Sequence, residues 1–166
     1  PVTAYDGEGR ATYPRLERVR LAPTGWRPLP LPTTGHDFGG VLRLSEAQSG
    51  PARVVAGGRL RVETRWHALA PPPRDYSIFL HLVPESGPAT ALSQYDGLLG
   101  GEAYPTGLWP RGETRTESVE LVVPPNAPPG RYRLLVGVYD WTTGQRLPVE
   151  RDGDAVVLGE IEVLAP

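Results

Sequence analysis

The sequence contains no cysteine, no methionine and no lysine. Without cysteine, no disulfide stabilises the fold, and thiol usage does not report the redox compartment. All 17 basic residues are arginine, a bias that we attribute to a GC-rich genome, that of a heat-adapted bacterium. A chain that begins at Pro1 and has no methionine is not a whole translation product, so we expect an excised or processed piece of a larger parent protein.

The sequence also lacks a positive charge excess and long apolar runs. The net charge is -2, with acidic and basic residues interleaved, which argues against a nucleic-acid partner because phosphate binding needs a clustered positive surface. No apolar run approaches the roughly 18 residues of a membrane-spanning helix, and no signal peptide opens the chain. We therefore expect contact with a membrane only through the parent protein.

Glycine and proline are abundant, at 20 residues each, and they punctuate apolar runs. Glycine supplies positive φ in tight turns and proline stops strand extension, so this spacing is typical of an all-β chain. Helical periodicity appears nowhere over a useful length. A chain of 166 residues is long enough for one domain with its own core.

Seven or eight short strands separated by turn signals predict a two-sheet antiparallel β-sandwich of the immunoglobulin or fibronectin-III type. The clearest strand alternates strictly, with Leu60 and Trp66 among its inward residues and His67 among those expected to face water. A buried Trp66 needs a partner for its indole N–H. The other expected strands cover Val41–Ser45, Tyr76–Val83, Ala89–Tyr95, Thr114–Val123, Tyr132–Tyr139 and Val156–Leu164.

Tyr132 follows Pro129-Gly130 and begins a strand with Leu134, Val136 and Val138 on the same face. This arrangement resembles a tyrosine corner, in which the hydroxyl bonds nearby backbone.

We divide the chain into a proline-rich N-terminal extension, residues 1–37, and a β-sandwich domain, residues 38–166. Within the extension, Trp26–Pro32 is typical of polyproline II. This segment is either a stiff linker from a preceding domain or a strip that packs on the sandwich through Trp26.

The residues needed for common enzyme chemistry are absent or badly spaced. The serines lack a nucleophile-elbow setting, and the three histidines are too far apart in sequence for a metal site on one element. Asp152-Gly153-Asp154 supplies too few oxygens for calcium, and Gly100-Gly101 is followed by no lysine and no helix that would bind phosphate. We therefore expect no catalytic residues, no metal and no cofactor in this chain, and no enzyme activity.

The strongest functional signal is a set of aromatic and acidic residues in two loop regions. Sugar rings stack on exposed aromatic faces, and nearby carboxylates accept hydrogen bonds from hydroxyls. The other interpretation is that the aromatics pin the long 96–113 loop onto the sandwich as a satellite core. A carbohydrate site requires at least two of the rings to be exposed and roughly coplanar. The candidate ligand-binding residues are Tyr95, Asp96, Tyr104, Trp109, Tyr139, Asp140 and Trp141.

Four blocks carry a family resemblance: Asp75–Leu82, Gly100–Glu113, Pro129–Tyr132, and Gly137–Asp140 with Gly144–Pro148. Over roughly residues 38–164, the chain resembles the sandwich domain at the extracytoplasmic C-terminal end of bacterial multi-span membrane glycosyltransferases of the dolichyl-phosphate-mannose type. The resemblance implies an immunoglobulin-like fold, an extracytoplasmic location and a tether to the cell membrane through the parent. It brings no catalytic residue, because the chemistry of those enzymes belongs to their membrane part.

Three functional hypotheses follow. The first is a non-catalytic extracytoplasmic module of a larger, membrane-anchored glycosyltransferase-like protein, which makes the rest of the parent chain a partner. The second is a carbohydrate-binding module that uses surface aromatics to bind a glycan. The third is a structural or adhesion spacer domain without a ligand.

Overall fold

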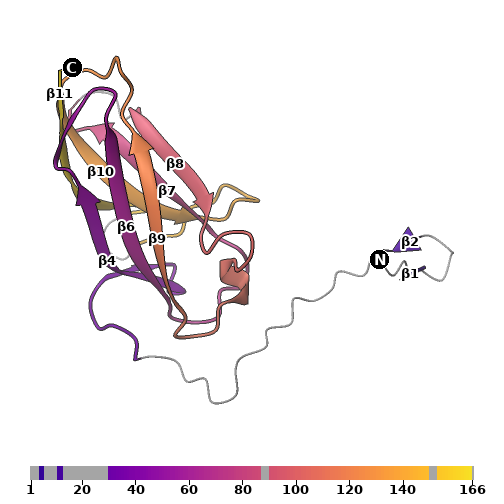
Figure 1. Ribbon diagram of the computed structural model, residues 1–166. Helices are drawn as coiled ribbons and strands as arrows, with labels where there is room; N and C mark the ends of the chain where they lie inside the picture. The colour runs from indigo at the N-terminus through magenta and orange to yellow at the C-terminus, as the bar shows by residue number, and fades with distance from the viewer. Residues whose placement is uncertain (1–3, 6–10, 13–29, 87–89, 150–152, 166) are drawn as a thin grey trace.

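The structure, a computed structural model, describes residues 4–5, 11–12, 30–86, 90–149 and 153–165. Two β-sheets face each other, as Figure 1 shows, and bury apolar side chains between them. The prediction of an all-β, two-sheet sandwich is confirmed. Within the described residues, the helical content is one 3₁₀ turn, η1 (Thr106–Leu108). A separate two-residue pairing joins β1 (Ala4–Tyr5) and β2 (Ala11–Thr12).

The larger sheet has five strands in the order β5-β11-β10-β7-β8. The pairs are antiparallel except that β5 runs parallel to β11. The start of β7 therefore lies beside the ends of β8 and β10, which brings residues distant in sequence to one end of the sheet. The bounds are β5 (Arg53–Val55), β7 (Ser77–Pro84), β8 (Ser93–Leu98), β10 (Gly130–Tyr139) and β11 (Val156–Leu164).

The smaller sheet has four antiparallel strands in the order β3-β4-β6-β9. Its central strand β6 carries the alternation that the sequence predicts, with every second side chain inside. A β-bulge at Ser45, between Leu44 and Glu46, adds one residue to β4 relative to β6. The bounds are β3 (His36–Phe38), β4 (Leu42–Gly50), β6 (Arg59–Ala68) and β9 (Thr114–Val122).

The core lies between the sheets and centres on Trp66, which is fully buried beside Phe38 with ring centroids 5.3 Å apart. Its indole N–H donates to the hydroxyl of Thr64 at 2.9 Å, which supplies the predicted partner. Each fully buried aliphatic side chain contributes about 1.5–3 kcal/mol of hydrophobic stabilisation. The inward residues of β10 are buried as predicted: Tyr132, Leu134, Val136 and Val138.

The Tyr132 hydroxyl donates to the carbonyl oxygen of Pro128 at 2.8 Å. This local hydrogen bond confirms the predicted tyrosine corner and fixes the turn that leads into β10.

Three of the described strands differ most from the predictions. The strand predicted at Ala89–Tyr95 is β8, which begins four residues later at Ser93 and ends at Leu98. The first expected strand ends at Ser45, whereas β4 continues to Gly50 because the bulge keeps it paired with β6. The sequence predicts a turn around Ser49–Pro51 and no strand at Arg53–Val55, but β5 forms there by pairing with β11. Such short edge strands depend on a distant partner, which periodicity does not reveal.

The prediction that His67 faces water is wrong. Its side chain is on the outer face of β6, yet it is only 9% exposed. Ser45 Oγ lies 2.8 Å from its Nε2 and Thr114 Oγ1 lies 2.9 Å from its Nδ1, so neighbouring strands enclose the ring. Burial, and to a smaller extent the charge of Arg65, lowers the pKa of His67.

The N-terminal part of the chain is described from Pro30 onward, apart from the β1–β2 pairing. Arg43 on β4 donates to the carbonyl oxygen of Pro32 and forms an ion pair with Asp37, so residues just before β3 contact the sandwich. β3 begins at His36, inside the predicted extension. Trp26 lies outside the described residues, and the division at residue 37 stays a prediction.

Candidate functional site

A groove of about 590 Å³ lies at the end of the five-stranded sheet where β7 begins and β8 and β10 end. This volume is within the range of small-ligand sites. We call it the Trp141 groove. It contains three of the seven predicted site residues, Asp96, Tyr139 and Trp141. The described residues that line it are Asp75, Ser77, Asp96, Gly97, Leu98, Glu102, Tyr139 and Trp141.

Trp141 is the exposed aromatic of the groove, with 61% of its surface accessible. It sits in the tight turn that follows β10. Asp140 organises this turn, because its Oδ1 accepts the backbone N–H and the hydroxyl of Thr142 at 2.9 and 2.6 Å. Gly144, at φ +71°, closes the turn by donating its N–H to the Asp140 carbonyl at 2.7 Å.

Asp140 is not available to a ligand, which corrects its predicted role. Its side chain is only 6% exposed, and its Oδ2 accepts a hydrogen bond from Arg74 Nη1 at 2.5 Å. The Thr142 hydroxyl and Arg74 together hold the pKa of Asp140 well below its usual range. Asp140 therefore positions Trp141 by fixing the turn, and Arg74 anchors that turn to the segment before β7.

Tyr139 forms one wall of the groove and is half-buried. The side chains of Ser77 on β7 and Asp96 on β8 lie close to its phenol. Burial and the negative charge of Asp96 raise the pKa of Tyr139, which keeps the hydroxyl protonated and able to donate. The strand order β10-β7-β8 brings these three side chains together.

Phe79 lies beside the groove on the outer face of the same sheet, yet it is 2% exposed. The guanidinium of Arg146, from the loop after β10, covers its ring at 4.3 Å. The paired residue on β10 is Gly137, where an added Cβ would lie 2.1 Å from Phe79 Cζ. The missing side chain at Gly137 therefore makes the space in which Phe79 lies.

Trp109 is not part of a binding surface, contrary to its predicted role. It is 1% exposed, and its indole N–H donates to the carbonyl oxygen of Tyr104 at 2.9 Å. Tyr104 packs partly buried against the core, donates to Glu113 at 3.1 Å and lies under the Arg115 guanidinium. Both aromatics pin the loop onto the sandwich, as the other interpretation expected, but Trp109 does so as part of the main core and not of a separate satellite core.

Tyr95 also lies outside the groove. It packs partly buried against the core, on the opposite side of β8 from Asp96. Burial raises the pKa of its phenol, and the nearby Glu117 charge adds to this effect. Trp141 and Tyr139 are therefore the two predicted aromatics that the fold brings to one groove.

Sequence reasoning missed Asp75 and Ser77, which follow the three prolines that end the preceding segment. Asp75 Oδ1 accepts the backbone N–H of Gly107 at 3.0 Å, which ties η1 to the groove rim. The buried hydroxyl of Thr106 completes this connection by accepting from Tyr76 N–H at 2.7 Å and donating to the Arg74 carbonyl at 3.1 Å. A polar residue directly before a buried strand is the sequence signal that could have identified Asp75.

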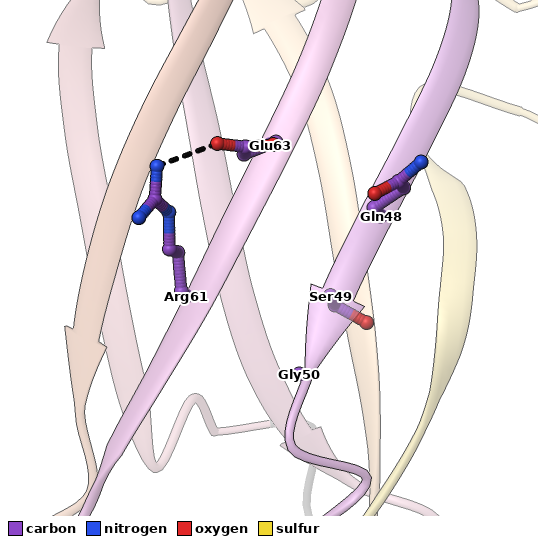
Figure 2. Close-up of a pocket in the computed structure, with 5 residues that line it drawn as sticks. All are labelled: Gln48, Ser49, Gly50, Arg61 and Glu63. Carbon is purple, nitrogen blue, oxygen red and sulfur yellow. Dashed lines mark hydrogen bonds and ion pairs between the residues drawn. The ribbon is translucent and has the colours of Figure 1, made fainter.

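A second hollow, of about 450 Å³, lies over the outer face of β4 and β6 (Figure 2). Its lining is Gln48, Ser49, Gly50, Arg61 and Glu63, and the two charged residues pair with each other at 2.6 Å. It contains no aromatic ring and no charge without a neighbouring opposite charge. This face is a solvated sheet surface, and we do not assign it a ligand.

The described residues offer little for metal or nucleophilic chemistry. Among them, no group of three His, Cys, Asp or Glu side chains is close enough to hold a metal ion. Ser45 and His67 are in contact, as the serine and histidine of a catalytic triad are. The second ring nitrogen of His67, however, contacts the Thr114 hydroxyl. A hydroxyl lacks the negative charge with which the carboxylate of a triad stabilises an imidazolium. No described helix has the length and apolar character that crossing a membrane requires.

These observations define a two-sheet antiparallel β-sandwich with an aromatic and acidic groove at one end. No protein-family model matches the sequence, and no match was found among curated proteins. Among solved structures, the chain is similar to the C-terminal domain of Wzt, with a TM-score of 0.55 and 14% identity over 83% of this chain and 82% of that one. This likeness supports the immunoglobulin-like sandwich fold.

Two further structures have lower scores. One is a CARDB domain from Pyrococcus furiosus, in complex with di-metal ions, with a TM-score of 0.44 and 14% identity over 80% of this chain and 95% of that one. The other is a β-glucosidase from Listeria innocua in complex with glucose, with a TM-score of 0.43 and 18% identity over 74% of this chain but 15% of that one.

Proposed function

We propose that this chain is a non-catalytic β-sandwich module that binds a glycan in the Trp141 groove. The observation that carries the proposal is the exposure of Trp141, at 61%, beside a groove of ligand size. An indole that is held by a rigid turn and open to solvent offers a flat apolar face on which a sugar ring stacks. Tyr139, Asp96 and Asp75 line the groove and offer hydrogen-bonding groups for sugar hydroxyls.

The turn supports this proposal because it makes the site preorganised. Asp140 is hydrogen-bonded with Thr142 and Arg74, so the Trp141 backbone does not need to become ordered when a ligand binds. Rigid aromatic groups bind with a small loss of conformational entropy. Single exposed apolar side chains are common on protein surfaces, so the fixed turn and the adjoining groove are what distinguish Trp141.

The test is whether neutral oligosaccharides bind to the full 166-residue chain. Isothermal calorimetry measures the affinity. The thermal midpoint of unfolding is a second measurement, because any ligand that prefers the native state must raise it. Trp141→Ala should weaken binding by at least about tenfold without lowering the midpoint of the free protein. The matched control is Val122→Ala, which truncates an exposed apolar residue, 51% accessible, on the smaller sheet.

Binding that survives Trp141→Ala would place the glycan elsewhere. If no oligosaccharide binds or shifts the midpoint, the chain is better described as a structural or adhesion spacer.

We also propose that the module belongs to a larger, membrane-anchored glycosyltransferase-like protein and lies outside the cytoplasm. The support is the sequence resemblance carried by Asp75–Leu82 and the other three blocks. The reading frame of the parent gene tests it. Several upstream runs of at least about 18 apolar residues would agree with the proposal, and an upstream region without them would contradict it.

A further inference from the structure

We infer that the Trp141 groove selects a cationic glycan, one built from sugars with free amino groups. This inference rests on the proposed function and adds the charge of the ligand to it. Two observations support the inference: the charged side chains that line the groove, and the contacts that the neighbouring arginines make with other groups.

Every charged side chain among the described residues that line the groove is acidic: Asp75, Asp96 and Glu102. Carboxylates attract a sugar ammonium and repel the carboxylate, sulfate or phosphate of an acidic glycan. The exposed face of Trp141 adds to the preference, because an ammonium near an indole face gains cation–π stabilisation that a neutral acetamide does not.

Two arginines lie close to the groove, and both are engaged with other groups. Arg74 forms its ion pair with Asp140 at 2.5 Å, behind the turn that carries Trp141. Arg146 covers the Phe79 ring and lies 3.3 Å from Asp154. Neither guanidinium forms an ion pair with Asp96 or Glu102, and no basic side chain is among the described residues that line the groove.

The carboxylates are also arranged for an extended ligand. Asp96 comes from β8, Asp75 from the segment before β7, and Glu102 from the loop after β8. Among the described residues, no three acidic or histidine side chains converge closely enough to hold one metal ion. Carboxylates spread along a groove beside an aromatic ring match amino groups that recur along a sugar chain better than a single small cation.

The experiment compares three tetrasaccharides on the full chain at low ionic strength: the tetramer of glucosamine, its fully N-acetylated form, and tetragalacturonate. The measurements are made at mildly acidic pH, where the amino groups are protonated. We expect the glucosamine tetramer to bind about fivefold more tightly than the acetylated form, and the uronate not to bind. Raising the ionic strength to about 0.5 M should remove most of this difference, because salt screens exposed charges.

Glu102→Gln should reduce the preference while binding of the acetylated form persists. Asp96→Asn, alone or combined with Glu102→Gln, should reduce the preference further and also weaken binding of the acetylated form, because Asp96 offers hydrogen-bonding groups in the groove. Glu102 is exposed, so its variant is expected to fold normally even if Asp96→Asn does not. The matched control is Glu85→Gln, which removes the same charge at the other end of β7 and should leave the preference unchanged.

Equal affinity for the amino and acetylated tetramers, or a preference that persists in the double variant, would overturn this inference and leave the proposed function in place. Tetralysine competing as strongly as the glucosamine tetramer would also overturn it, because the site would then be a cationic-peptide site. If no saccharide binds, the proposed function fails and this inference fails with it.

Discussion

At the residue scale, Trp109 and Trp141 have the same chemistry and opposite environments. Trp109 follows η1 and is 1% exposed, whereas Trp141 follows β10 and Asp140 and is 61% exposed. A buried indole with a hydrogen-bonded N–H contributes to stability, whereas an exposed indole adds little to stability and offers area to a ligand.

The first prediction concerns these two residues. Trp109→Ala should lower the free energy of unfolding by about 3–5 kcal/mol, because it leaves a cavity and removes the hydrogen bond to the Tyr104 carbonyl. Trp141→Ala should change it by less than about 0.5 kcal/mol. Urea denaturation followed by circular dichroism measures both, with Trp109→Phe as an intermediate variant that retains most of the volume. Equal effects of the two alanine variants would contradict the assignment of Trp109 to the core.

The second prediction concerns Asp140. Because its pKa is lowered in the folded state, its contribution to stability is fully present above its ordinary pKa of 3.8 and is lost as the pH falls through the lower folded value. Asp140→Asn should therefore lower the thermal midpoint at neutral pH, and the difference from the wild type should shrink in strong acid.

The control for this prediction is Asp154→Asn, which alters an exposed ion pair with Arg146 and should have little effect. A difference between the wild type and Asp140→Asn that grows as the pH falls below 3.8 would contradict the assignment.

At the scale of elements, β7 and β10 are buried on both faces where they meet the Arg146 loop. Phe79 occupies the outer face opposite Gly137, and the loop after β10 folds back over it. Tyr139 ends β10 and Trp141 begins the loop that carries Arg146, so the packing of Arg146 on Phe79 also holds these two residues at the end of the sheet. The groove is therefore supported by outer-face packing as well as by the core between the sheets.

The third prediction is that Gly137→Ala lowers the free energy of unfolding by about 1–3 kcal/mol, because the new methyl group would meet the Phe79 ring at 2.1 Å and the Asp154 carbonyl oxygen at 2.9 Å. Gly159→Ala in β11 is the control, since the nearest atom there is 4.0 Å away. Adding Phe79→Leu to Gly137→Ala should recover part of the loss, which denaturation of the double variant would show. If the effects of Gly137→Ala and Phe79→Leu on the free energy of unfolding are additive, the contact between residue 137 and the Phe79 ring is contradicted.

At the scale of the whole molecule, the sandwich buries His67 and partly buries two further titratable groups, His81 and Glu117. Burial lowers the pKa of His67 and of His81 and raises that of Glu117, whose Oε1 accepts the N–H of Gly100 at 2.9 Å. Each shift makes the stability of the entire fold depend on pH, because folding and proton binding are linked.

The fourth prediction follows from the signs of these shifts. For His67 and His81 the folded state favours the neutral ring, so stability is full above the unfolded pKa of 6.5 and falls as the pH drops below it. Glu117 acts in the opposite sense: its contribution is present below its unfolded pKa of 4.5 and is lost as the pH rises through its folded pKa. The thermal midpoint should therefore decrease between pH 7 and about pH 5.5.

The double variant His67→Gln, His81→Gln should show a smaller change of the thermal midpoint between pH 7 and about pH 5.5 than the wild type. Glu117→Gln should not reduce this change. A profile that keeps its slope in the histidine double variant would assign the pH dependence to other groups.

The sequence alone determined the features that depend on local order. Strict alternation identified β6 and the inward face of β10, and a tyrosine after Pro-Gly identified the corner at Tyr132, because side chains in a strand alternate between faces and turns need particular residues. It also determined the all-β class and brought Asp96, Tyr139 and Trp141 into the candidate set.

Only the tertiary structure decided which of those aromatics are exposed and which carboxylates line the groove. Asp140 pairs with Arg74, 66 residues away, and Trp109 is buried by a loop that Asp75 and Thr106 hold in place. His67 is enclosed by Ser45 and Thr114, which belong to two other strands. Burial and pairing of this kind arise from contacts between distant segments, and the period of a single strand carries no information about them.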